Sequence, residues 1–417
     1  AATVYGPIGD GFSLEVPPLS AAHTQAKWGV VDVTLPPFSA DPTGNSDSTE
    51  ALQHAINFAR EHAMVAFFPS GEYLISDTLD CGQNLFIRST GLVTGQREEG
   101  PCVLLGSRLG PKPRIVLAPN SPGFNNPANG KAMIYLWARS YKGNPEQDQP
   151  NIIINQMVVN LELEVEPGNS GAIGIRNQGA QGSGIEDVLL RMNDGLTGIL
   201  GGAGSGGSHS NITVIGGEVG VDMVGAQPAP TLTGATLLGQ TRNAIHYRGP
   251  QNLAIVGARI EMAPGATTPA INVPTMTGGY SAVKGQLSIL DSSIVFPTAR
   301  TGNLAVAAGR SVYMKDVYVS GAGQISRSPD GETLSGNLNS WNHVREYAHD
   351  VRHPVYSDFG ISVQYEAPVY LNGARSFNDV EDINANGSAP PANMQSQHVW
   401  GADFPNWEMA TANVMAD

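Results

Sequence analysis

The chain reads Asp41-Pro42-Thr43-Gly44-Asn45-Ser46 at the start of its most sharply patterned stretch. Pro and Gly break regular structure, so this motif predicts a turn. A helix is expected directly afterwards, because the Asp47 carboxylate can accept amide protons of a first helical turn and Glu50 follows three residues later, as in a capping box. The next apolar residues fall on one helical face: Leu52, Ala55, Ile56 and Ala59. The stretch therefore predicts an amphipathic helix with one buried stripe.

Two short apolar segments follow this helix, Val65–Phe68 and Tyr73–Ile75, and the breaker Pro69-Ser70-Gly71 separates them. They are typical of two strands joined by a tight turn. A stack of such strands would leave a hydrophobic end open, and terminal repeats must be capped if a repeat protein is to stay soluble. We therefore expect the helix to cap the N-terminal end of a repeat structure.

A short motif returns along the chain from about residue 150. Its copies match, several of them loosely, a pattern in which an apolar pair precedes a Gly or Asp, which stands at positions 187, 216, 234, 257, 291 and 316. Gly, Asp and Asn tolerate positive φ, so we expect these residues at the corners between stacked strands. Asp187, Asp291 and Asp316 are accordingly interpreted as corner residues in preference to catalytic ones.

Repeats of roughly 20–30 residues that contain short strands and turns, without a helix in each unit, predict an all-β chain. The expected fold is a right-handed parallel β-helix with an N-terminal capping helix. We divide the chain into an N-terminal arm and cap (1–80), the β-helix rungs (81–330), and a polar connector with a C-terminal tail (331–417). The glycine-rich segment 201–207 is expected to be a loop between rungs, since no phosphate-binding motif surrounds it.

The composition suits a turn-rich β protein and disfavours several partners. Charged residues make up only 14% of the 417 positions, whereas the chain contains 50 Gly and 29 Pro. The net charge of −14 opposes a phosphate backbone, so nucleic acid is not an expected partner. No apolar run approaches the roughly 18–20 residues of a membrane span, and the opening Ala1-Ala2-Thr3 lacks the features of a signal peptide. We expect a secreted chain that has already been processed.

Cys81 and Cys102 are the only cysteines of the chain. They have no His or Cys neighbours at the spacing of zinc ligands, so a structural zinc site is not predicted. The sequence leaves open whether the two thiols form a disulfide.

Three motifs near the N-terminus are shared with a known family: Asp41-Pro42-Thr43-Gly44, Asp47-Ser48-Thr49-Glu50-Ala51-Leu52-Gln53 and Phe68-Pro69-Ser70-Gly71-Glu72-Tyr73. They resemble the opening of the pectate-lyase-3 type β-helix family. That family includes polysaccharide lyases, glycoside hydrolases, epimerases and phage tailspikes. The resemblance therefore implies the β-helix fold and a polysaccharide partner more firmly than it implies one reaction.

Further glycine-rich motifs follow: Gly171-Ala172-Ile173-Gly174-Ile175-Arg176, Gly204-Ser205-Gly206-Gly207 and Gly216-Gly217-Glu218-Val219-Gly220. Over about residues 30–330 the chain resembles the first β-helix of the family 55 glycoside hydrolases, exo-β-1,3-glucanases built from two β-helices. The resemblance implies a glycoside hydrolase. In those enzymes the acid catalyst lies in the second β-helix, which has no counterpart here. We therefore expect one half of a longer protein, or a chain that has lost its second unit, so a second half or a second copy of the chain is a candidate partner.

The densest set of polar groups runs from Trp341 to His353. Carboxylates and imidazoles can transfer protons, and aromatic rings can stack on sugars. We therefore predict three catalytic residues, Glu346, Asp350 and His349. We also predict three substrate-binding residues, Trp341, Tyr347 and Arg352. The alternative is a solvated connector whose charges pair with one another.

Other sites stay open. Glycoside hydrolysis needs two facing carboxyl groups, and neighbouring rungs can supply Glu218 with Asp222, or Glu261 with Asp291. A polysaccharide lyase would instead need a base and a cation beside a uronate carboxylate; the candidate cations are Lys284, Arg300 and Arg259. No cofactor is expected, although Ca²⁺ would suit a lyase. The expected function is a glycoside hydrolase of the β-1,3-glucanase type, with a lyase or a non-catalytic glycan-binding, tailspike-like module as alternatives.

Overall fold

The computed structural model describes residues 19–83, 85–87, 93–95, 100–138, 153–204, 207–223, 230–275, 285–329, 331–349, 352–355, 363–366, 369–371, 374–376 and 380–399. Between residues 85 and 95, and between 352 and 376, the description covers backbone only. The chain divides into two compact units, Ala1–Gly207 with Phe404–Asp417 (unit one) and Ser208–Asp403 (unit two).

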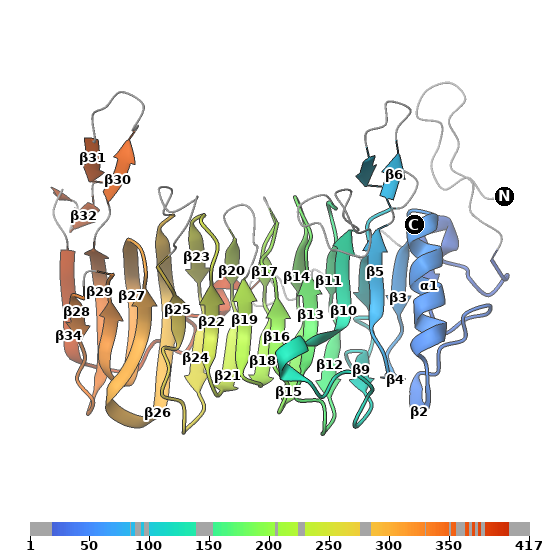
Figure 1. Ribbon diagram of the computed structural model, residues 1–417, viewed down its shortest axis with the longest axis horizontal. Coiled ribbons are helices and arrows are strands. Elements are labelled where there is room, and N and C mark those ends of the chain that lie inside the picture. The colour runs from blue at the N-terminus through green and yellow to red at the C-terminus, as the bar shows by residue number, and fades with distance from the viewer. Residues whose placement is uncertain are drawn as a thin grey trace. The chain divides into compact units, whose positions relative to one another are not determined.

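Unit one is a stack of short parallel strands in three rows (Figure 1). The first row contains β1 (Val30–Asp32), β3 (Val65–Phe68), β8 (Val103–Gly106), β11 (Met157–Val159) and β14 (Gly184–Glu186). The second row contains β2 (Thr43–Asp47), β4 (Glu72–Ile75), β9 (Arg114–Leu117), β12 (Glu162–Val165) and β15 (Leu189–Asn193). The third row contains β5 (Leu79–Gln83), β10 (Lys131–Ala138), β13 (Ala172–Asn177) and β16 (Thr197–Leu200).

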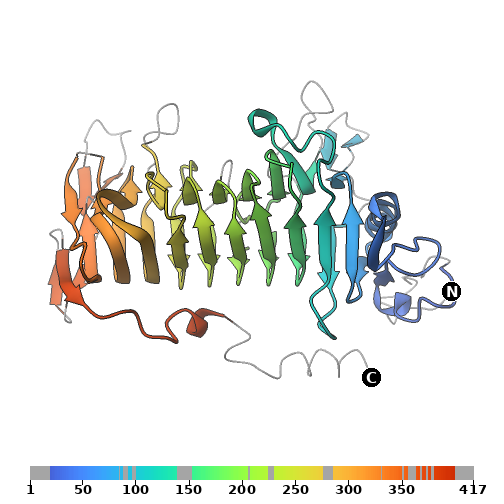
Figure 2. The same ribbon diagram turned by 90° about the horizontal axis from the view of Figure 1, so that it is seen from below.

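Unit two repeats the three rows with longer strands at its end (Figure 2). The first row of unit two contains β17 (His209–Ser210), β20 (Thr231–Thr233) and β23 (Leu253–Val256). The second row contains β18 (Thr213–Gly216), β21 (Thr236–Gln240) and β24 (Arg259–Met262). The third row contains β19 (Val219–Met223), β22 (Asn243–Tyr247) and β25 (Ile271–Val273). β26 (Leu287–Ala308) pairs in parallel with the last strand of every row, and β27 (Val312–Arg327) pairs with β26. The predicted right-handed parallel β-helix is confirmed.

Aliphatic side chains stack along the inside of each unit. In unit one Leu79, Ile134 and Ile175 are register partners on successive strands, and all three are fully buried. In unit two Val221, Ile245 and Ile271 form the equivalent ladder. Since successive residues of a strand point to opposite faces, the residue beside each of these positions points outward. This alternation determines which side chains can meet a ligand.

The predicted cap is present as α1 (Thr49–Glu61), which lies against β3 and β5 at the blue end of unit one (Figure 1). Its buried apolar face contains the predicted residues Leu52, Ala55, Ile56 and Ala59. Ser48 occupies the N-cap position, one residue later than the predicted Asp47. The Asp47 carboxylate still accepts the Thr49 amide proton, at 2.9 Å between N and Oδ1.

The predicted corner residues have the expected backbone. Asp187, Gly234, Gly257, Asp291 and Asp316 all have positive φ, between 45° and 66°, and each follows a first-row strand segment. Gly216 also has positive φ, but it ends the second-row strand β18 and so marks a different corner.

Residues 331–349 and 380–399 differ from the polar connector expected there. β29 (Trp341–His349) pairs antiparallel with β27 and with β34 (Val380–Gly387), and β28 (Thr333–Ser335) also pairs with β27. These strands cover the last rung of unit two. Periodicity did not indicate them because polar side chains occupy most of their outward positions.

Residues 391–399, here called the C-terminal strap, return along the first-row corners of unit two after β34 (Figure 2). The Gln395 amide nitrogen donates to the carbonyl oxygen of Ala235 at 2.8 Å, and His398 is hydrogen-bonded to Asp291 at 2.9 Å. The strap contains the short helix η3 (Ser396–His398).

The remaining described elements are short. They are η1 (Ala26–Trp28), η2 (Pro127–Asn129) and the antiparallel pairs β6 (Leu85–Ile87) with β7 (Val93–Gly95), β30 (Arg352–Val355) with β31 (Val363–Glu366), and β32 (Val369–Leu371) with β33 (Ala374–Ser376). Among the described residues, no helix is long and apolar enough to cross a membrane.

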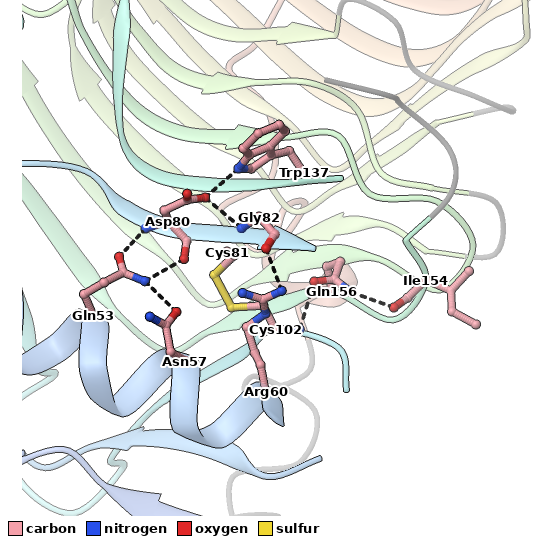
Figure 3. Close-up of a disulfide and its surroundings, with 10 residues drawn as sticks. All are labelled: Gln53, Asn57, Arg60, Asp80, Cys81, Gly82, Cys102, Trp137, Ile154 and Gln156. Carbon is pink, nitrogen blue, oxygen red and sulfur yellow. Dashed lines mark hydrogen bonds between the residues drawn. A yellow bond between two sulfur atoms is a disulfide. The ribbon is translucent and has the colours of Figure 1, made fainter. Parts of the chain in front are cut away.

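The two cysteines, whose state the sequence left open, form a disulfide that links β5 to the residue before β8 (Figure 3). Helix α1 is anchored next to it. The Gln53 side chain is hydrogen-bonded to both the backbone N–H and the carbonyl of Asp80, and Arg60 donates to the carbonyl of Gly82 at 2.8 Å (Figure 3). The capping helix α1 and the strand β5 are therefore joined by polar contacts as well as by apolar packing.

Candidate functional site

The predicted catalytic residue Glu346 lies on the outer face of β29, opposite Lys315 of β27. Its side chain is buried, and the Tyr313 hydroxyl donates a hydrogen bond to Glu346 Oε1 at 2.9 Å. Burial and the contact with the Glu346 carboxylate raise the pKa of Tyr313 to about 12. Glu346 is therefore ordered by a neutral tyrosine that donates to it.

Two of the other predicted site residues, Tyr347 and His349, do not join Glu346. Tyr347 and His349 pair with the inward residues Met314 and Val312, and their rings are nearly parallel with centroids 6.2 Å apart. Because strand residues alternate in direction, these two side chains lie on the opposite face from Glu346.

Trp341 begins β29 and pairs with Gly387. Asp350 lies outside the described residues, and for Arg352, the first residue of β30, only the backbone is described. The assignment of these residues to a site stays a prediction.

A different polar depression lies on the outer face of β19, β22 and β25 in unit two. Its volume is about 330 Å³. It is lined by Asp222, Arg242, Asn243, His246, Arg248, Thr268, Pro269 and Asn272, here called the Asp222 pocket. Asp222, His246 and Asn272 are register partners on the three strands, each next to an inward aliphatic residue. The β-helix stacking thus brings a carboxylate, an imidazole and an amide into one row.

The Asp222 carboxylate is the most buried charged group of the pocket, with 7% of the residue exposed. Its Oδ2 lies 3.4 Å from His246 Nδ1 and 3.5 Å from Arg248 Nη2. Its Oδ1 has no hydrogen-bond partner within the part of the chain that the structure describes. A buried carboxylate oxygen without a partner is unfavourable in a purely structural role, and a ligand or water can supply the missing donor.

Arg242 forms the other charged edge of the pocket. Its Nε lies 3.7 Å from Oε2 of Glu218, a half-exposed side chain just before β19. Glu218, expected as the partner of Asp222 in one of two carboxylate pairs, therefore contacts a lining residue of the depression without lining it itself. The second expected pair does not face: Glu261 is the register partner of Val295, and Asp291 occupies a corner bonded to the strap.

Sequence reasoning missed Arg242, His246, Arg248 and Asn272. A signal for His246 and Asn272 exists, because each directly follows an inward Ile, as Asp222 follows Val221. Aligning the rungs on these inward residues would have placed the three polar side chains in one column. Loops of unequal length between the rungs hide this alignment.

The pocket offers one carboxylate among its lining residues and no second hard anionic ligand. Ca²⁺ takes six to eight oxygen ligands, usually with several carboxylates. Across the described ranges, no group of three or more His, Cys, Asp or Glu side chains is placed to hold a metal ion.

A family model described as rhamnogalacturonase A/epimerase, pectate lyase-like, matches residues 36–268. No curated protein matches the chain. Among solved structures, the surface adhesin PfbA of Streptococcus pneumoniae is 11% identical with a TM-score of 0.39, covering 73% of this chain and 81% of that one. The Agl-KA catalytic domain is 17% identical with a TM-score of 0.41, covering 72% of this chain and 55% of that one.

The catalytic unit of a thermostable GH87 α-1,3-glucanase from Streptomyces thermodiastaticus strain HF3-3 is 16% identical with a TM-score of 0.36. The match covers 72% of this chain and 61% of that one. Similarities this distant say nothing specific about the chemistry of the Asp222 pocket.

Proposed function

Since the chain belongs to the rhamnogalacturonase A/epimerase, pectate lyase-like family, we propose that it is a secreted enzyme that degrades a polysaccharide. The proposed reaction is glycoside hydrolysis of the β-1,3-glucanase type, carried out by the chain alone or together with a second half or copy. The Asp222 pocket carries this proposal, because it gathers a buried carboxylate and several hydrogen-bond donors on an open sheet face.

The side chains of the pocket suit the hydroxyl groups of a sugar. Asp222 offers an acceptor oxygen without a partner, and Arg248, Asn243 and Asn272 offer donors. The pocket lies on the outside of a sheet, where a polymer can extend along the strands in either direction. A polymeric substrate therefore fits this position better than a small molecule that needs an enclosed cavity.

The charge balance of the pocket favours a neutral sugar over a uronate. Arg248 faces Asp222, and Arg242 faces Glu218, so each arginine already has a carboxylate partner. A lyase needs a cation that neutralises the carboxylate of the substrate during proton removal. The net charge of −14 points the same way, since it repels a polyanion at long range. These two observations support hydrolysis over β-elimination.

Within this proposal Asp222 and Glu218 are the two carboxyl groups of the hydrolase. Residues four positions apart on an extended segment have Cα atoms about 13 Å apart, so of the two known geometries only the wider spacing of inversion, roughly 6.5–9.5 Å between carboxyl groups, suits this pair. Asp222 is held between His246 and Arg248, and Glu218 stands at the Arg242 edge. His246 is assigned the role of orienting the Asp222 carboxylate toward the bound sugar.

The test compares Asp222→Asn with Glu346→Gln on a panel of neutral β-glucans and polyuronates, following reducing ends and ultraviolet absorbance together. We expect reducing ends without absorbance, a roughly 10²–10⁴-fold lower turnover in Asp222→Asn, and unchanged turnover in Glu346→Gln. If Glu346→Gln instead loses turnover and Asp222→Asn keeps it, the active site lies on β29. An absorbance signal would show that the protein is a lyase. If no substrate gives a product, the proposed hydrolase is wrong and the protein is a glycan-binding module.

A further inference from the structure

A second outward row of functional side chains lies in unit one, on the third-row sheet. Asp80 of β5, Tyr135 of β10 and Arg176 of β13 are register partners on three successive strands. Each directly follows a fully buried aliphatic residue of the inner ladder, Leu79, Ile134 or Ile175, so the row points outward. Adjacent strands are about 4.8 Å apart, so the row spans about 10 Å.

The side chains of this row are ordered by contacts with one another. The Arg176 guanidinium carbon lies 4.6 Å from the centroid of the Tyr135 ring, and the Tyr135 and Trp137 rings are nearly parallel with centroids 5.3 Å apart. Trp137 Nε1 donates to Asp80 Oδ1 at 2.5 Å, a contact visible in Figure 3. One connected array therefore runs from a carboxylate through two aromatic rings to a guanidinium.

A glycine on the neighbouring strand, Gly82, leaves room for the Trp137 indole. A Cβ atom at Gly82 would lie 2.5 Å from Nε1 of Trp137, so any larger residue would displace the indole (Figure 3). Trp137 is only 7% exposed although it stands on the outer face, whereas Tyr135 and Arg176 are both partly exposed. Trp137 therefore positions the array, and the side chains of Tyr135 and Arg176 are the partly accessible members of it.

We propose that this row is a second carbohydrate-contact site, separate from the Asp222 pocket, which binds a neutral, hydroxyl-rich polysaccharide chain laid across β5, β10 and β13. Its ligand class follows from the function proposed above. The Asp80 carboxylate accepts hydrogen bonds from sugar hydroxyls, the Arg176 guanidinium donates them, and the Tyr135 hydroxyl does both. The opposite charges of Asp80 and Arg176 leave the row without the surplus charge that would select an ionic ligand.

Rigidity is the physical reason why such a row can bind a flexible polymer. Side chains that are already stacked and hydrogen-bonded lose little rotational freedom when the ligand arrives, so more of the contact energy appears as affinity. A span of about 10 Å across three strands is long enough to contact more than one sugar ring. The site therefore acts on long chains more strongly than on short oligosaccharides.

The experiment measures retention of the full chain in gels containing a neutral β-glucan, and in parallel its turnover of a short oligosaccharide. Tyr135→Ala and Arg176→Met are the test variants. Arg327→Met, which removes the same charge from the exposed end of β27, is the matched control. We expect about tenfold weaker polymer binding in both test variants, with unchanged short-substrate turnover and a control that binds like the wild type.

Trp137→Phe keeps an aromatic ring but removes the donor to Asp80, so it tests the positioning role separately. A several-fold rise in the KM for the polymer, without a change in kcat, supports that role. Wild-type polymer binding in both Tyr135→Ala and Arg176→Met overturns the proposal, even if Asp222→Asn has lost its activity as expected. A wild-type chain that neither binds nor cleaves any glucan overturns this site and the proposed function together.

Discussion

Aspartate at a rung corner combines a backbone role with a side-chain role. Asp187, Asp291 and Asp316 adopt the positive φ that the turn between two strands requires. Their carboxylates also meet nitrogen atoms from other segments, at 2.5 Å from Arg108, 2.9 Å from His398 and 2.9 Å from His343, respectively. Corner aspartates therefore hold neighbouring chain segments in place, and none of them lines the Asp222 pocket.

Glycine at the same corner leaves room for the C-terminal strap. A Cβ at Gly257 would lie 2.7 Å from Cδ2 of His398, whereas at Gly239 its nearest neighbour would be the Gly216 backbone nitrogen at 3.8 Å, an ordinary contact, although both residues have positive φ. We expect both Gly→Ala substitutions to lose about 1–2 kcal/mol for the left-handed backbone. Gly257→Ala should lose about 1 kcal/mol more, because His398 must move away from Asp291.

Urea unfolding of Gly257→Ala and Gly239→Ala measures this difference, and limited proteolysis between residues 391 and 399 reports release of the strap. Equal losses in the two variants, with an equally protected strap, would show that the strap does not select glycine at position 257.

Asp47 makes the N-terminal cap sensitive to acid. Burial alone would raise the pKa of Asp47, but hydrogen bonds donated by Ser76 and Thr49 together lower it below its ordinary value. A carboxyl group whose pKa is lowered by folding stabilises the folded state above its ordinary pKa, and this contribution is lost as the pH falls toward the folded value.

We expect the thermal midpoint of the wild type to fall below about pH 4, and Asp47→Asn to show a lower midpoint at pH 7 with a shallower acid dependence. Thermal unfolding followed by circular dichroism between pH 7 and pH 2 measures both. Glu61→Gln, at the other end of α1, is the control. An acid dependence in Asp47→Asn as steep as in the wild type would contradict the assignment.

At the scale of elements, α1 and the first strands of unit one act as one block. Gln53 and Arg60 bind the backbone of β5, and the disulfide joins β5 to the start of β8 (Figure 3). The cap is therefore attached to strands of two different rows. This arrangement protects the open end of the stack, where an exposed core would otherwise meet water.

Removal of the disulfide should destabilise this block. The bond closes a segment with a sequence separation of 21 residues, for which the chain-entropy argument gives about 3 kcal/mol. We expect the double variant Cys81→Ala/Cys102→Ala to unfold at lower urea concentration than the oxidised wild type and to be insensitive to a reducing agent. A wild-type transition that does not shift on reduction would contradict this expectation.

β29 illustrates what periodicity misses. The start of β29 alternates between buried and exposed side chains, since Asn342 and Val344 are buried and His343 and Arg345 are not. The buried asparagine and the outward charges made the segment resemble a connector. Asn342 is satisfied internally, because its side-chain amide donates to the carbonyl of Val319 at 3.1 Å. A polar core residue with a backbone partner is invisible to a search for apolar repeats.

At the scale of the whole molecule, the net charge of −14 determines which polymers can approach. Charges separated by more than about 10 Å are largely screened at 0.1 M salt. We expect apparent affinity for a polyuronate to rise as salt increases from about 0.01 M to 0.1 M, and affinity for a neutral β-glucan to stay constant. Affinity electrophoresis at the two ionic strengths measures both. Polyuronate binding that weakens with salt would instead indicate a local basic groove.

The sequence by itself determined the β-helix, the capping helix and the corner residues, because each depends on local preferences. Apolar pairs form short strands, a capping motif starts α1, and residues such as Asp187 and Gly234 tolerate positive φ. The tertiary structure decided which residues meet: Asp222 with His246, Cys81 with Cys102, and Gly257 with His398. These pairs depend on the register between rungs whose loops differ in length, and no local preference encodes that register.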